Sequence, residues 1–217
     1  MKRHFHHELE DLRNQLILIG EKANEAARIA VDGFLNSDLE KLNAAIAKDD
    51  AIDALEVEID RASVRYITLR SPVSTDVRFI LVAIKASHDL ERAGDEAHSI
   101  AMKAKNIIAR DGQVNNTVTI EKMSQLTGAM MKDAITSLVA GDIDLAKAVI
   151  ERDKAVNQLH KENFQLLSVG TEADSTEAAT RFETILISKS LERIADHAKN
   201  LAEEVIYLLT AKLTPNA

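Results

Sequence analysis

The sequence contains no cysteine and no tryptophan, and it has few residues that interrupt regular structure. Without cysteine there can be no disulfide bond, no zinc site with thiolate ligands and no iron–sulfur cluster held by cysteine. Aromatic residues make up only 3% of the chain, so alanine, leucine, isoleucine and valine must form the core, which favours closely packed helices. Seven glycines and two prolines among 217 residues favour long, uninterrupted elements.

The chain also has no excess of positive charge and no long hydrophobic run. It carries 27 basic and 35 acidic residues, for a net charge of -8, whereas proteins that bind nucleic acid are usually basic. The longest apolar run, Phe79–Ile84, is too short to cross a bilayer. The N-terminal residues lack the apolar segment of a secretory signal. We therefore expect a soluble protein that binds no nucleic acid, and the lack of cysteine fits a reducing cytoplasm.

Apolar residues recur at helical spacing, and breaking residues divide the pattern into six helices. The expected ranges are 8–35, 38–69, 74–110, 119–140, 142–169 and 175–212. Asp38 and Asp142 are expected to cap the second and fifth helices, and Ser74 and Ser175 to begin the third and sixth. The histidines at the N-terminus, His4, His6 and His7, are interpreted as part of a mobile terminus.

The second half of the chain repeats the first. Residues 90–101 (LERAGDEAHSIA) and 191–202 (LERIADHAKNLA) share six of twelve positions at a shift of 101, and the second and fifth helices align at a shift of 104. The shared caps and apolar positions indicate a tandem duplication. We expect an all-α protein of two three-helix bundles, with residues 1–112 as the first repeat and 113–217 as the second.

Each half carries two oxygen-rich pairs spaced four residues apart, which places both members of a pair on one face of a helix. The pairs are Asp49/Asp53, Glu91/Asp95, Asp153/Asn157 and Glu192/Asp196. A single acidic pair means little in a chain with 35 acids, but its repetition in both halves is informative. We expect the two pairs of each half to meet on one solvent-accessible surface, because uncompensated acids are costly to bury.

Like charges at this spacing cost a helix a few tenths of a kcal/mol, so something must compensate them. Arg92 and Arg193 directly follow the glutamates, and side chains at that spacing are expected to point away from the acids. Three interpretations stay open: a bound cation, a solvated acidic face and a basic protein partner. Clustered carboxylates without cysteine suit magnesium, calcium, manganese, iron or zinc.

An enzyme with a carboxylate-bridged pair of metals is a further alternative. The ferritin-like form of such a site needs Glu-x-x-His pairs on two helices. Asp95-x-x-His98 approaches this pattern, but its counterpart is Asp196-x-x-Lys199. His88 and His98 are therefore interpreted as ordinary helix residues, and no catalytic residue is expected.

Four segments together resemble the PhoU family of phosphate-uptake regulators, and the resemblance covers nearly the whole chain. They are Arg70–Arg78 (RSPVSTDVR), Asp89–Asp95 (DLERAGD), Glu151–Asn157 (ERDKAVN) and Ser190–Asp196 (SLERIAD). The resemblance implies two tandem three-helix bundles, homodimers, and Glu/Asp-x-x-x-Asp motifs that bind multinuclear metal clusters in some members.

The resemblance further implies a cytoplasmic, non-enzymatic regulator that acts with a phosphate ABC transporter and a membrane sensor histidine kinase, and meets the membrane only through them. Its role would be to restrain the phosphate-starvation response. The implied metal ligands are Asp49, Asp53, Glu91 and Asp95 in the first half, and Asp153, Asn157, Glu192 and Asp196 in the second. The ions would be divalent or trivalent: iron, manganese, zinc or magnesium. Asn157 in place of an acid, and Ala195 in place of Gly94, make the second site the weaker one.

Overall fold

The protein is built from helices. A computed structural model describes residues 2–111, 117–168 and 175–212, and no strand occurs within these ranges. The helices are α1 (Lys2–Leu35), α2 (Leu39–Ile46), α3 (Asp49–Arg70), α4 (Ser74–Asp111), α5 (Val118–Ala140), α6 (Ile143–Ser168) and α7 (Ser175–Thr210). The predicted all-α fold is confirmed.

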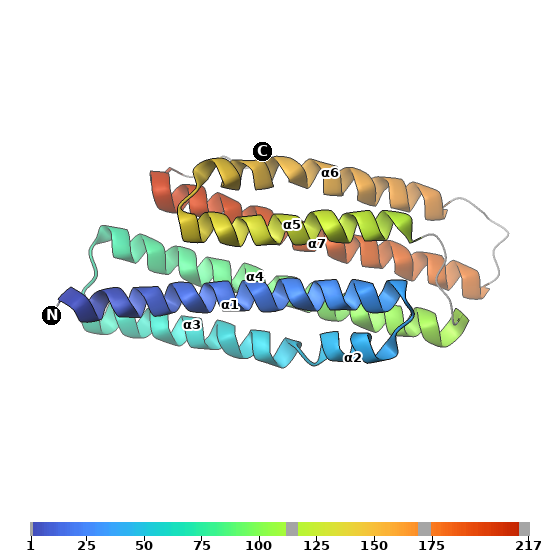
Figure 1. The fold of residues 1–217 in the computed structure, drawn as a ribbon, viewed down its shortest axis with the longest axis horizontal. Coiled ribbons are helices and arrows are strands. Elements are labelled where there is room, and N and C mark those ends of the chain that lie inside the picture. The colour runs from blue at the N-terminus through green and yellow to red at the C-terminus, as the bar shows by residue number, and fades with distance from the viewer. Residues whose placement is uncertain (1, 112–116, 169–174, 213–217) are drawn as a thin grey trace.

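The helices form two similar sets. In the first, α1 packs against α2, α3 and α4, and in the second, α5, α6 and α7 pack against one another (Figure 1). Two tandem three-helix bundles are therefore present, as predicted. The predicted second helix is interrupted at Ala47 and Lys48, where the Lys48 amide bonds three residues back to Ala45 instead of four. Neither glycine nor proline marks this break, so the sequence pattern did not reveal it.

Capping residues begin α2 and α6 where the sequence predicted. Asp38 accepts hydrogen bonds from the backbone amides of Glu40 and Lys41, and Asp142 accepts the two equivalent bonds in the second half. Gly141 ends α5 in the left-handed conformation, at a φ of 66°.

The predicted ends of the long helices need one correction. Helix α1 starts at Lys2 rather than Glu8, so the backbone of the histidine-containing segment is helical. Helices α4 and α7 begin at Ser74 and Ser175 as expected. Helix α4 ends at Asp111, one residue past its predicted end, and the end predicted for the fifth helix at residue 169 lies outside the described residues.

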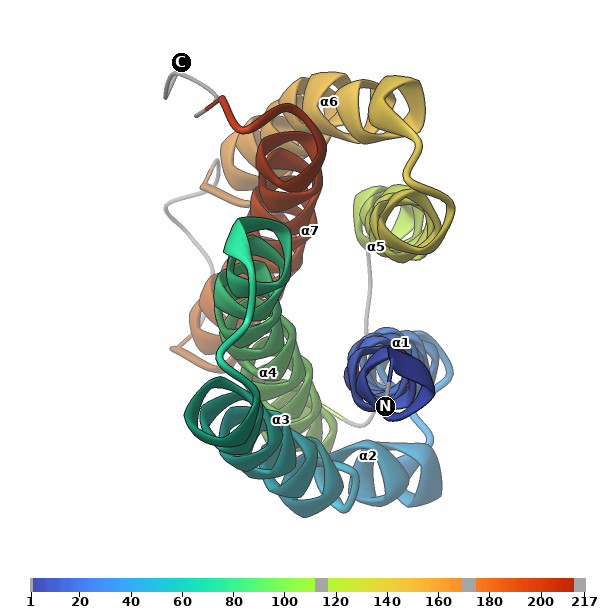
Figure 2. The same cartoon turned by 90° about the vertical axis from the view of Figure 1, so that its left-hand side faces the viewer.

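The two halves share one core. Helices α4 and α7 cross antiparallel along the middle of the molecule, with ion pairs joining Lys85 to Glu204 and Glu96 to Arg193, each at 2.8 Å. Helix α1 also packs against α5. Figure 2 shows α3, α4, α7 and α6 following one curved layer, with α1 and α5 on its inner side. No helix in the described part of the chain is long and apolar enough to cross a membrane.

Candidate metal centre

The facing sides of α3 and α4, which we call the first groove, gather all four predicted ligands of the first half. Its side chains are Asp49, Asp53 and Glu56 from α3 and His88, Glu91, Asp95 and His98 from α4. Steps of three and four residues along each helix place these side chains on one stripe. The two stripes run antiparallel and face each other, so Glu56 meets His88 at one end and Asp49 meets His98 at the other.

The tightest cluster consists of Glu56, His88 and Glu91. One ligand atom from each lies within 4.8 Å of the others, and His88 Nδ1 is 3.1 Å from Glu56 Oε1. The Glu91 carboxylate is only 16% exposed. Its Oε2 atom is buried and has no hydrogen-bond partner among the described residues. A buried carboxylate oxygen without a donor is the arrangement that a cation would satisfy.

The other end of the groove has the same character. His98 Nδ1 lies 2.7 Å from Asp49 Oδ2, while Asp49 Oδ1 is buried without a hydrogen-bond partner in the described structure. Asp53 and Asp95 lie between the two ends. Burial raises the pKa of Asp53, and the charges of Asp49 and Asp95 raise it further. The predicted ligands of the first half therefore face one groove.

The Glu91 carboxylate is repelled by acids on both sides of it in the groove. Burial raises the pKa of Glu91, and the charges of Asp95 and Glu56 add to the shift. The ligands on α3 extend over seven residues, or about 10 Å along the helix axis.

The spacing in the sequence predicted that Arg92 points away from the acids, but in the structure it points toward them. Its Nη1 atom is 3.2 Å from Asp95 Oδ2, and its Nε atom is 3.7 Å from Glu91 Oε2. The expectation was wrong because the arginine side chain is long enough to bend along the helix surface and reach Asp95, three residues further along the chain. Arg193 instead forms an ion pair with Glu96 on α4, at 2.8 Å.

A glycine lets the two helices of the groove approach closely. A Cβ atom at Gly94 would lie 2.9 Å from Ile52 Cδ1 and 3.1 Å from Ile52 Cγ2. Both distances are shorter than normal carbon–carbon contacts. The side chain of Ile52 thus packs directly on the α4 backbone, next to the acids of both helices.

Sequence reasoning missed three members of the groove. Glu56, His88 and His98 were not among the predicted ligands, and the two histidines were interpreted as ordinary helix residues. Their spacing held the missing signal, because His88 lies three residues before Glu91 and His98 three residues after Asp95. Both histidines therefore share the stripe of the predicted acids.

In the second half, the predicted residues lie on the facing sides of α6 and α7, which we call the second groove, and they contact one another in a different way. Asn157 Nδ2 donates to Asp153 Oδ2 at 3.0 Å, and Lys199 Nζ lies 3.7 Å from the same oxygen. Asp153 is only 5% exposed, whereas the sequence analysis expected an accessible site. Burial raises the pKa of Asp196, as do the charges of Glu192 and Asp153, while Lys199 lowers it.

The two grooves differ in how well they fit a metal ion. The first offers carboxylate oxygens and imidazole nitrogens, the ligands preferred by manganese, iron and zinc. In the second, two lysines lie against the acids. An ammonium group has no lone pair to offer a metal.

The PhoU domain family matches the chain twice, over residues 16–104 and 120–205. The chain belongs to the PhoU family. One match falls in each set of helices, so the PhoU unit occurs twice and the resemblance drawn from the four sequence segments is confirmed.

Similar proteins of this family cover nearly the whole chain. The "Phosphate-specific transport system accessory protein PhoU homolog" of Pseudomonas aeruginosa is 31% identical over 209 residues, which are 96% of this chain and 86% of that protein. The protein of the same name from Aquifex aeolicus is 35% identical, over 93% of this chain and 90% of that protein. The crystal structure of PhoU from Pseudomonas aeruginosa matches with a TM-score of 0.91 and 32% identity, covering 96% of this chain and 100% of that one.

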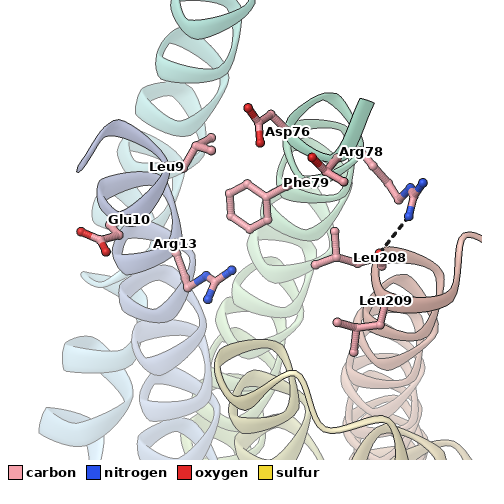
Figure 3. A pocket seen from close by; sticks show the side chains of 9 residues that line it. Leu9, Glu10, Arg13, Asp76, Arg78, Phe79, Leu208 and Leu209 are labelled. Atoms are coloured by element: carbon pink, nitrogen blue, oxygen red, sulfur yellow. Dashed lines mark hydrogen bonds between the residues drawn. The ribbon is translucent and has the colours of Figure 1, made fainter. Parts of the chain in front are cut away.

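A cavity of about 430 Å³ lies between the N-terminal turns of α1 and α4 and the C-terminal end of α7 (Figure 3). Two arginines, Arg13 and Arg78, line it together with two acids, Glu10 and Asp76. Arg78 already donates to the carbonyl oxygen of Leu208 at 3.3 Å. The charges of the two arginines and the two acids cancel, so the cavity has no excess of positive charge with which to bind phosphate.

Proposed function

We propose that the groove between α3 and α4 is a metal centre. The observation that supports this most directly is the cluster of Glu56, His88 and Glu91, whose ligand atoms lie within 4.8 Å of one another. Asp49, Asp53, Asp95 and His98 extend the ligand set along the same groove. The bound ions would offset the repulsion among these five carboxylates, which Arg92 reduces at the edge of the groove.

The ligand types favour borderline metals over hard ones. Imidazole nitrogens suit zinc, iron and manganese, whereas magnesium and calcium prefer oxygen ligands alone. We therefore place manganese, iron and zinc ahead of magnesium, in divalent or trivalent form and with one or more ions in the groove.

We further propose that the protein is a negative regulator of phosphate uptake and of the phosphate-starvation response. Its membership of the PhoU family supports this role, as do the names of its relatives, which are accessory proteins of a phosphate-specific transport system. In this role it acts in the cytoplasm, as a homodimer, between the ATPase of a phosphate ABC transporter and a sensor histidine kinase. The metal centre serves this adaptor function rather than catalysis.

Deletion of the gene tests the regulatory role. A reporter fused to a phosphate-starvation promoter should be active in the deletion strain even when phosphate is plentiful. Wild-type protein supplied in trans should restore repression. Normal repression in the deletion strain would contradict the proposal.

The metal-dependent enzyme and the metal-storage bundle are the competing functions, and the mixed histidine–carboxylate groove is what favours them. Both histidines lie on α4, whereas the ferritin-like site draws Glu-x-x-His pairs from two helices. Turnover of a small substrate by the metal-loaded protein, abolished by Asp95→Ala, would support an enzyme. Uptake of many ions per chain would support storage.

A further inference from the structure

The two grooves occupy equivalent places in the two halves, and their residues can be compared position by position. At the shift of 104 between α3 and α6, Asp49 corresponds to Asp153, Asp53 to Asn157 and Glu56 to His160. At the shift of 101 between α4 and α7, His88 corresponds to Lys189, Glu91 to Glu192, Asp95 to Asp196 and His98 to Lys199. Three acids are retained, and the other four positions have all changed.

Every one of these four changes makes the second groove more positive. An acid is replaced by an amide at Asn157 and by an imidazole at His160, while Lys189 and Lys199 replace histidines. With neutral histidines, the seven positions carry a formal charge of -5 in the first half and -1 in the second. Arg92 adds one positive charge at the edge of the first groove, and its counterpart Arg193 turns away to Glu96.

The lysines lie against the acids that were expected to bind metal. Lys199 Nζ is 3.7 Å from Asp153 Oδ2, which is the pairing equivalent to that of His98 with Asp49 in the first half. Lys189 Nζ is 2.5 Å from Glu192 Oε2. The Asp153 side chain is 7% exposed, so its interaction with the ammonium group is little screened by solvent.

The remaining donors of the second groove are also engaged. Asn157 uses its amide nitrogen to donate to Asp153 Oδ2. His160 Nδ1 lies 2.8 Å from Ser188 Oγ. Asp153 Oδ1 is buried without a hydrogen-bond partner in the described structure. However, an ion bound at this oxygen would be placed close to the Lys199 ammonium, which repels it.

We infer that the groove between α6 and α7 holds no metal ion, because Lys189 and Lys199 supply the positive charge that a metal supplies in the first half. This inference rests on the proposed metal centre between α3 and α4. It makes the molecule asymmetric in chemistry although its two halves share one fold. The first groove binds metal, whereas most of the acidic charge of the second is offset by its own lysines.

Metal binding to matched variants of the full chain tests the inference. Protein stripped with a chelator is titrated with Zn²⁺ and with Mn²⁺, and bound metal is measured by calorimetry and elemental analysis. Glu91→Gln/Asp95→Asn should abolish binding, while Glu192→Gln/Asp196→Asn, the same change at the equivalent positions, should leave stoichiometry and affinity unchanged. Loss of part of the bound metal in the second variant would overturn the inference.

A gain of binding provides the complementary result. Changing the four divergent positions to their first-half residues gives Asn157→Asp/His160→Glu/Lys189→His/Lys199→His. In the Glu91→Gln/Asp95→Asn background, this variant should recover metal binding in the second groove. If it binds no metal although circular dichroism shows it folded, the lysines are not what excludes the ion.

A stability measurement separates this inference from the proposed metal centre. Wild-type protein that binds neither metal would refute the metal centre but would leave the role of the lysines open to test. With chelator present throughout, Lys199→Met should lower Tm more in the wild-type background than in an Asp153→Asn background. In the wild-type background the change leaves the Asp153 carboxylate without its cation, whereas in the Asp153→Asn background there is no carboxylate to leave unpaired. Equal shifts in the two backgrounds would overturn the role assigned to Lys199.

Discussion

Glu91 lies at the point where the acids of the first groove interact most closely. Its carboxylate is mostly buried, and the charges of Asp95, Glu56 and Asp53 all disfavour its ionised form. Glu192 is its counterpart, at 13% exposure, and pairs with Lys189 at 2.5 Å. The same residue type at equivalent positions therefore lies among acids in one half, with Arg92 Nε 3.7 Å from its carboxylate, and forms a 2.5 Å ion pair with a lysine in the other.

The raised pKa of Glu91 gives its effect on stability a definite sign. The folded protein holds the Glu91 proton more tightly than the unfolded chain, in which the pKa is 4.5. Its contribution to stability is therefore fully present below pH 4.5 and is lost as the pH rises through the raised folded-state value. Glu91→Gln should raise the free energy of unfolding of the metal-free protein at pH 7, on the order of 0.5 kcal/mol, and should give no gain at pH 4.

Denaturant unfolding followed by circular dichroism at both pH values measures this effect. Glu192→Gln is the matched control and should not stabilise the protein at pH 7, because it removes the ion pair with Lys189. A Glu91→Gln protein that is less stable than wild type at pH 7 without metal would show that the neighbouring carboxylates do not destabilise ionised Glu91.

At the scale of the helix, the approach of α3 to α4 depends on Gly94 and Ile52. The counterparts of these residues in the second half are Ala195 and Val156, so one methyl group is added on one helix and one is removed from the other. Gly94→Ala should destabilise the protein by about 1 kcal/mol, since overpacking costs about 1–3 kcal/mol and helix propensity returns up to about 1 kcal/mol.

The double variant Gly94→Ala/Ile52→Val should recover that loss, because the shorter side chain removes the Cδ1 atom that meets the new methyl group at 2.9 Å. Thermal unfolding of the two single variants and the double variant measures the coupling. Additive effects of the two changes would mean that the helices do not meet at these residues.

Helix caps give an independent test at the same scale. Asp38 and Asp142 each accept two backbone hydrogen bonds at the start of a helix. Replacing either by alanine should lower the free energy of unfolding by about 1 kcal/mol. Replacement by asparagine should lower it much less, because asparagine is also a good capping residue. Urea unfolding measures both, and alanine variants as stable as wild type would contradict the assignment of these caps.

The elements could be predicted well because their signals are local. Asp38, Asp142 and Gly141 fix helix ends through their own backbone or side chain, and the repeated sequence disclosed the two bundles. The break at Ala47 and Lys48 has no such signal, since both residues are compatible with a continuous helix.

The site was only partly predictable because it depends on contacts between helices. Repetition drew attention to the acids, but it hid His88 and His98, whose counterparts are lysines. The position of Arg92 depends on how its long side chain bends, which residue spacing alone does not determine. Likewise, the pairing of Lys199 with Asp153 becomes visible only when α6 and α7 are placed side by side.

At the scale of the molecule, the two repeats do not form separate bodies. Buried residues of both halves belong to one core, and α4 and α7 are joined along much of their length by packing and ion pairs. Unfolding one half would expose the apolar surface of α4 or α7. We therefore expect a single cooperative transition in calorimetry, with equal calorimetric and van't Hoff enthalpies. Two resolved transitions would show that the repeats are independent.

Anomalous scattering can decide whether metal binds in the first groove alone, because it locates the ion without prior assumptions. Crystals of the full chain are grown with Zn²⁺ and measured at the zinc absorption edge. We expect a peak among Glu56, His88 and Glu91, with any further peak lying toward Asp49 and His98, and no peak between α6 and α7. A peak beside Asp153 and Glu192, or none between α3 and α4, would contradict this expectation.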